Sequence, residues 1–126
     1  MERLVRALAE QPDVTFAYLY GSFLGKRPFR DVDVGVYLEN VDAATSGSAA
    51  ERTLEIATRL SAELELPVDV RLLNGAPPTF AFHVLRGRRL LSRNDDLLAH
   101  VLAETARRYL DLEPLLRRAT KEAFAA

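Results

Sequence analysis

The 126-residue chain lacks cysteine, which excludes disulfide bonds, thiolate zinc sites and cysteine nucleophiles. It has no excess of one charge, because 17 Lys and Arg nearly balance 18 Asp and Glu, so no broad field attracts nucleic acid or an anionic membrane. No apolar run approaches the roughly 20 residues that cross a bilayer. Residues 1–11 also lack the apolar stretch of a signal peptide. We therefore expect a cytoplasmic location, with no direct binding of nucleic acid or membrane.

The length and composition indicate one globular domain spanning residues 1–126. Apolar residues make up 48% and charged residues 28%, which is typical of globular proteins. Apolar spacing predicts strands at 14–20, 31–38, 68–73 and 89–92. It predicts helices at 3–10, from Ser48 in a capping box with Glu51, and from Pro77 to about Gly87. It also predicts C-terminal helices from about residue 95, capped by Asn94 and kinked or interrupted at Pro114. The second helix is expected to bury Leu54, Ala57, Thr58, Leu60 and Leu64.

The segment DVDVGVYL, from Asp31 to Leu38, alternates strictly and places Asp31 and Asp33 on one face of a strand. Two such carboxylates repel one another unless a cation lies between them, and Mg²⁺ prefers oxygen ligands. Asp69 lies on another strand, opposite a row of apolar residues. If the two strands are neighbours in register, all three aspartates line one patch that suits two metal ions and phosphoryl or nucleotidyl transfer.

A phosphate-binding element is expected where the first strand ends in Gly21 and Ser22. Glycine lets the backbone approach a ligand closely, and Lys26, Arg27 and Arg30 on the following loop can neutralise a triphosphate. Gly35, on the acidic face, is expected to leave room for substrate. Taken singly, the Gly-Ser pair reads as an ordinary turn and Asp-x-Asp as a solvated strand edge; their combination favours a functional site.

These residues resemble the minimal nucleotidyltransferases of the DNA polymerase β superfamily, whose signature is Gly-Ser, Asp-x-Asp and a later Asp on a strand. The segments VDVRLLNGAPPTFAFHVLRGRRLLSRND (68–95) and YLDLEPLLRR (109–118) are similar to the antitoxin branch of that family, called MntA. The resemblance implies an α+β fold, with a small mixed β-sheet backed by helices. It also implies an all-helical HEPN ribonuclease toxin, HepT, as partner in a hetero-oligomeric complex.

Members of this branch are understood to transfer AMP from ATP to a tyrosine of the toxin. The resemblance therefore implies that Asp31, Asp33 and Asp69 hold Mg²⁺, that Asp69 helps to activate the acceptor hydroxyl, and that Gly21 and Ser22 hold the triphosphate. The loop departs from many relatives, because Leu24-Gly25-Lys26-Arg27 replaces an Arg-Gly pair. Two alternatives stay open: an antitoxin that acts by binding alone, and a nucleotidyltransferase acting on a small hydroxyl compound.

Overall fold

The computed structural model describes residues 1–21, 31–41 and 46–124 of the chain. These residues form four strands and four helices at the places that the apolar spacing predicts. Their bounds are α1 Glu2–Ala9, β1 Val14–Tyr20, β2 Val32–Leu38, α2 Ser46–Leu64, β3 Val68–Leu72, α3 Pro78–Leu85, β4 Arg88–Ser92 and α4 Asp95–Phe124. Most of these boundaries lie within two residues of the predicted ones.

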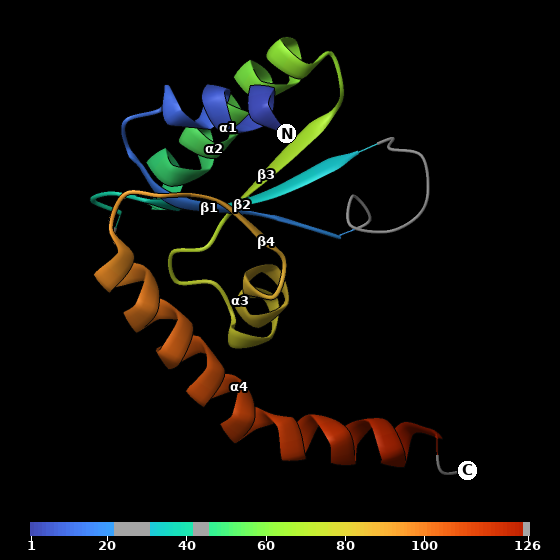
Figure 1. Ribbon diagram of the computed structural model, residues 1–126. Coiled ribbons are helices and arrows are strands. Elements are labelled where there is room, and N and C mark those ends of the chain that lie inside the picture. Colours follow the sequence, from blue (N-terminus) through green and yellow to red (C-terminus); the bar gives the residue numbers. More distant parts are fainter. Residues whose placement is uncertain (22–30, 42–45, 125–126) are drawn as a thin grey trace.

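The strands form one mixed sheet in the order β3-β2-β1-β4. β1 pairs antiparallel with both β2 and β4, whereas β2 and β3 are parallel and are connected through α2. Figure 1 shows α1 and α2 on one side of the sheet and α3 and α4 on the other. The chain therefore has the α+β fold, with a small mixed sheet backed by helices, that the resemblance implies.

Strict alternation along the strands gives each face of the sheet its own core. The face toward α1 and α2 carries the valines of β2 and β3 together with Leu4, Leu8, Leu19, Ile56 and Leu60. The face toward α3 and α4 carries Phe16, Tyr18, Tyr20, Leu73, Val84 and Leu98. Because the aspartates alternate with those valines, they emerge on the second face, beside α3.

Arg52 connects α2 to the start of β1. Its guanidinium donates to both carboxylate oxygens of Asp13 at 2.8 Å and to the side-chain oxygen of Gln11 at 2.7 Å. This hydrogen-bonded ion pair holds the pKa of the Asp13 carboxyl below its ordinary value. It fixes the helix that covers the valine face to the strand at the centre of the sheet.

The predicted start and buried stripe of the second helix are wrong in part. α2 begins at Ser46, so Ser48 lies inside its first turn and is not the cap. The helix buries Ala49, Ile56 and Leu60, while Leu54 is 68% exposed and Thr58 is also exposed. Apolar residues occur on more than one side of this helix, so the choice of stripe depends on how the helix rotates against β2 and β3.

The last helix begins as predicted, and of the two outcomes predicted for Pro114, a kink or an interruption, the structure has the kink. The backbone N–H of Leu97 donates to the side-chain oxygen of Asn94 at 3.0 Å, which confirms the expected cap. α4 then continues through Pro114 to Phe124 and changes direction along its length (Figure 1). Proline removes one helical hydrogen bond and bends a helix, but the turns on either side can continue it. No helix within the described ranges is both long and apolar enough to span a membrane.

Candidate functional site

One row of side chains crosses the sheet where β1 ends and where β2 and β3 begin. Tyr20 of β1 is the register partner of Asp33 on β2, and Asp33 is in turn the partner of Asp69 on β3. Register partners project from the same face of a sheet. The predicted register is therefore confirmed, and the carboxylates of Asp33 and Asp69 lie on the same side.

Asp31 joins these two carboxylates in a single hollow. It directly precedes β2, where the N–H of Val32 donates to the carbonyl of Pro67 at 3.0 Å and so brings the starts of β2 and β3 together. The hollow has a volume of about 360 Å³ and is lined by Asp31, Asp33, Ser61, Pro67, Val68 and Asp69. Three carboxylates from two neighbouring strands thus face one space that is open to solvent.

The electrostatics of the hollow are those of a crowded acidic site. Burial, and then the charges of Asp69 and Asp31, raise the pKa of Asp33 above its ordinary value, while Arg71 acts in the opposite direction. Burial and the charge of Asp33 likewise raise the pKa of Tyr20 to about 12. A cation placed in this hollow would relieve the repulsion between the carboxylates.

The donor atoms fit Mg²⁺ in kind, since all three are carboxylates. Among the described residues, however, no three acidic or imidazole side chains come close enough to enclose a metal ion by themselves. Mg²⁺ characteristically keeps several waters and is completed by substrate phosphates, so it does not need a closed protein cage. The arrangement fits a site that is completed by its substrate.

Gly21 follows β1 and lies beside the carboxylate of Asp33. Its φ of +79° lies in the left-handed region that side chains disfavour. A Cβ atom at this position would also stand 2.6 Å from Oδ2 of Asp33. Both observations require glycine here, because the backbone of β1 turns directly beside the Asp33 carboxylate. The other predicted phosphate-binding residues, Ser22, Lys26, Arg27 and Arg30, lie outside the described residues.

The expectation for Gly35 is wrong. A Cβ atom there would lie 2.5 Å from Cγ1 of Val84 on α3 and 3.4 Å from Cγ of Leu73. The space beside Gly35 is therefore filled by the protein itself. This glycine lets α3 pack closely against the sheet, and substrate does not occupy that position.

Arg71 is a site residue to which the sequence reasoning gave no role. It follows Asp69 by two residues on β3, so that it shares the acidic face, and its Nε lies 3.1 Å from Oδ2 of Asp69. The signal was present in the sequence as an arginine at i+2 from the third aspartate. Arg71 also contacts Phe80 of α3, whose ring centre lies 5.9 Å from the guanidinium carbon. The sequence alone did not indicate this contact.

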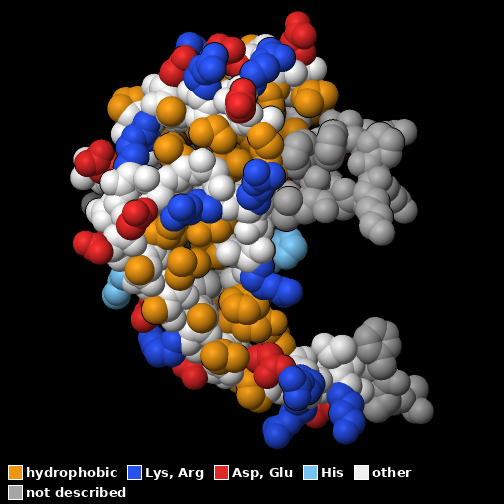
Figure 2. Space-filling model, in the orientation of Figure 1, with side chains coloured by type: hydrophobic (Ala, Val, Ile, Leu, Met, Phe, Trp, Pro, Cys, Tyr) orange, Lys and Arg blue, Asp and Glu red, His pale blue; other side chains and the backbone are white. Residues whose placement is uncertain are grey.

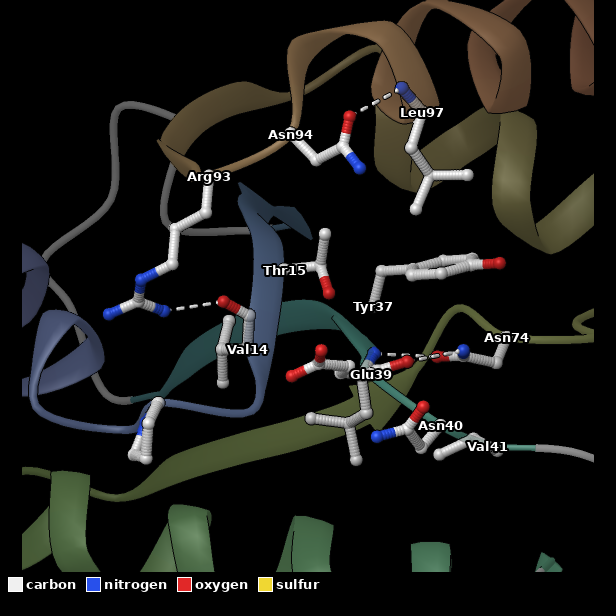
Figure 3. Close-up of a pocket in the computed structure, with 12 residues that line it drawn as sticks. Val14, Thr15, Tyr37, Glu39, Asn40, Val41, Asn74, Arg93, Asn94 and Leu97 are labelled. Carbon is white, nitrogen blue, oxygen red and sulfur yellow. Dashed lines mark hydrogen bonds between the residues drawn. The ribbon is translucent and has the colours of Figure 1, made fainter.

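A larger hollow, of about 430 Å³, lies at the opposite end of the sheet. Figure 3 shows that several polar groups lining it are already bonded within the chain. Arg93 donates to the carbonyl of Val14, Asn94 caps α4, and Asn74 exchanges two hydrogen bonds with the backbone of Leu38. Those groups serve the fold, so this hollow is a weaker candidate than the acidic one.

The fold is that of a nucleotidyltransferase. The profile of the family described as Polymerase beta, Nucleotidyltransferase matches residues 2–96, so the chain belongs to that family. Among curated proteins, no sequence matches the chain closely enough to count as a relative.

Solved structures agree with this fold over almost the whole chain. A chain from a toxin–antitoxin crystallised with AMP-PNP has a TM-score of 0.74 at 20% identity, with 98% of each chain covered. The toxin–antitoxin MntA-HepT gives 0.70 at 18% identity, covering 98% of this chain and 96% of that one. A re-refined structure of tri-AMPylated Shewanella oneidensis HEPN toxin with MNT antitoxin gives 0.70 at 19%, covering 98% and 95%. At these identities the likeness shows the fold.

Proposed function

We propose that this chain is an antitoxin that transfers AMP from ATP to a tyrosine hydroxyl of a HEPN ribonuclease toxin. The observation that carries the proposal is the convergence of Asp31, Asp33 and Asp69 in one hollow beside Gly21. We further propose that residues 1–126 act as one nucleotidyltransferase unit in the cytoplasm. The family supports the type of reaction, while the acceptor and the partner are inferences from chains of similar fold.

The proposed chemistry is the displacement of pyrophosphate at the α-phosphorus of ATP. The acceptor oxygen forms a bond to that phosphorus, the bond to the oxygen bridging to the β-phosphorus breaks, and pyrophosphate leaves with the electron pair. Asp69 takes the hydroxyl proton as the reaction proceeds. Two Mg²⁺ ions held by the three aspartates would supply the positive charge that this transfer needs.

The proposed partner follows from the chains to which the fold is similar. One of them was crystallised with AMP-PNP, and another belongs to a complex with a tri-AMPylated HEPN toxin. On this chain, the second half of α4 offers leucines for such a contact: Leu110, Leu115 and Leu116 are 64%, 60% and 41% exposed. Hydrophobic side chains are visible in the lower part of the molecule, where this helix runs (Figure 2).

The test is a transfer assay with the purified toxin, ATP and Mg²⁺, read by intact-protein mass spectrometry. We expect the toxin to gain the mass of AMP, and peptide sequencing to place it on a tyrosine. Asp31→Asn and Asp33→Asn should each reduce the rate by at least about 100-fold. Asp96→Asn, which removes the same charge from an exposed position in the first turn of α4, serves as the matched control. Addition of AMP that survives both site variants would refute the proposal.

A second candidate is an antitoxin that neutralises the toxin by contact alone. The exposed leucines of α4 favour it, since they offer a contact surface that does not depend on the carboxylates. A growth assay with co-expressed toxin separates the two candidates. The double variant Asp31→Asn with Asp33→Asn should leave the toxin active if transfer is required, and should still protect the cells if contact suffices.

A further inference from the structure

The guanidinium group of Arg71 makes two contacts in the acidic site. Its Nε lies 3.1 Å from Oδ2 of Asp69, and its guanidinium carbon lies 5.9 Å from the centre of the Phe80 ring. A cation over an aromatic face is attracted by the ring quadrupole. The side chain is therefore retained on the acidic face by a carboxylate on one side and by a ring of α3 on the other.

The contact with Asp69 can be exchanged at little cost. The side chains of Arg71 and Asp69 are 62% and 55% exposed, and ion pairs this open stabilise a fold very little. The charge of Arg71 also acts on Asp33 and on Tyr20. Arg71 thus balances the acidic cluster as a whole, while its loss would barely affect folding.

We propose that Arg71 is the exchangeable counter-ion of Asp69 and a phosphate-binding residue of the site. It pairs with Asp69 while nucleotide is absent, and it turns to the phosphate oxygens of the nucleotide when Asp69 binds a divalent cation. This inference rests on the proposed function. It adds a cation from β3 to the phosphate site, for which the sequence had pointed to the loop cations Lys26, Arg27 and Arg30.

The physical reason is a conflict of charge at one carboxylate. A divalent cation and a guanidinium that share Asp69 repel each other, so binding of the first displaces the second. The freed guanidinium keeps its charge at any working pH and presents parallel N–H groups that match phosphate oxygens. Because Phe80 holds it over the same face, it remains within reach of the hollow.

The experiment measures binding to the unmodified protein without the toxin. Mn²⁺ alone is followed by water-proton relaxation, and ATP with saturating Mg²⁺ by calorimetry. We expect Arg71→Gln to tighten Mn²⁺ binding and to weaken ATP binding, each by about three- to tenfold. This is the effect of one unit charge about 5–6 Å from a doubly charged group in a water-like dielectric, reduced by salt screening. Arg71→Lys, which keeps the charge, should stay within about twofold of wild type in both measurements.

Arg107→Gln is the matched control, since Arg107 is 60% exposed and ion-paired with Glu104 on α4. Binding by Arg71→Gln that equals binding by this control, or ATP binding that strengthens, overturns the inference. Arg71→Lys behaving like Arg71→Gln overturns it as well, because the charge would then not be the cause. If the wild type transfers AMP while Arg71→Gln leaves Mn²⁺ and ATP binding unchanged, the role of Arg71 is refuted and the proposed function stands. If the wild type binds no Mn²⁺ and transfers no AMP, the proposed function falls with it.

Discussion

Replacing Gly21 by alanine should separate activity from stability. The residue has a φ of +79°, and the new Cβ would stand 2.6 Å from Oδ2 of Asp33. The backbone strain of a non-glycine residue in the left-handed region costs about 1–2 kcal/mol of folding free energy. The collision is with the end of a side chain, so a rotation of the Asp33 carboxylate relieves it and adds little to that cost.

That rotation moves Asp33 out of the site. A displacement of about 1 Å in a reacting constellation can lower a rate by about 100-fold, and we expect a loss of this order in AMP transfer by Gly21→Ala. Gly75→Ala provides the matched control, because Gly75 has a φ of +67° but nothing within 4 Å of its Cβ position. It should lose the same stability, a few degrees in Tm, while keeping its activity.

The assay pairs urea unfolding with toxin modification followed by mass spectrometry, both at a temperature where each variant is fully folded. Equal losses of activity in the two variants would mean that strain alone explains the effect. Full activity of Gly21→Ala would mean that the carboxylate of Asp33 does not need its present position. Either result would refute the reasoning that connects this glycine to the site.

Three further predictions concern stability, measured by urea unfolding in metal-free buffer. Because burial and the charge of Asp69 raise the pKa of Asp33, the ionised form of Asp33 opposes folding. Asp33→Asn should therefore stabilise the protein at pH 7 and give no gain in stability below about pH 4. A loss of stability at pH 7 would contradict this. The hydrogen bond from Arg52 lowers the pKa of Asp13, so this pair stabilises the fold above about pH 4 and less as the pH falls through the folded-state pKa. Arg52→Gln should therefore lower the free energy of unfolding more at pH 7 than in acid. An equal loss at both pH values would exclude the ion pair as the cause. Ile56→Ala should cost about 2–5 kcal/mol and Leu54→Ala less than about 0.5 kcal/mol, in the reverse of the order that the predicted stripe implies.

The convergence of the aspartates was predictable because strand alternation fixes which residues share a face. Once Asp33 and Asp69 each follow a buried valine, a single assumption, that their strands are neighbours in register, brings them together. The pairing itself had to be assumed, since spacing within one strand says nothing about its neighbour. The resemblance to a known family supplied the mixed sheet that the spacing could not.

The errors arose where tertiary packing decides the outcome. Gly35 lies on the acidic face, as predicted, but only the position of α3 shows that a helix fills the space beside it. Ser48 has the form of a cap, yet the Ser, Gly and Ala residues around it carry too little local preference to fix where α2 begins. At Pro114 the sequence predicted a kink or an interruption without choosing between them, and the hydrogen bonds on either side continue the helix.

Several constraints on the described structure lie together at the acidic site. Three carboxylates face one another there, the pKa of Asp33 is raised, and Gly21 adopts a conformation that side chains disfavour. Elsewhere, Asn74 is paired with the backbone of β2 and Arg52 with Asp13, whereas Oγ of Ser92 is buried without a hydrogen-bond partner in the described residues. Replacing one of these aspartates by Asn would reduce the repulsion between the carboxylates. Selection for stability alone would therefore not keep all three. Repulsion between like charges is typical of sites that are completed by a ligand, and a cation is the ligand that would relieve it here.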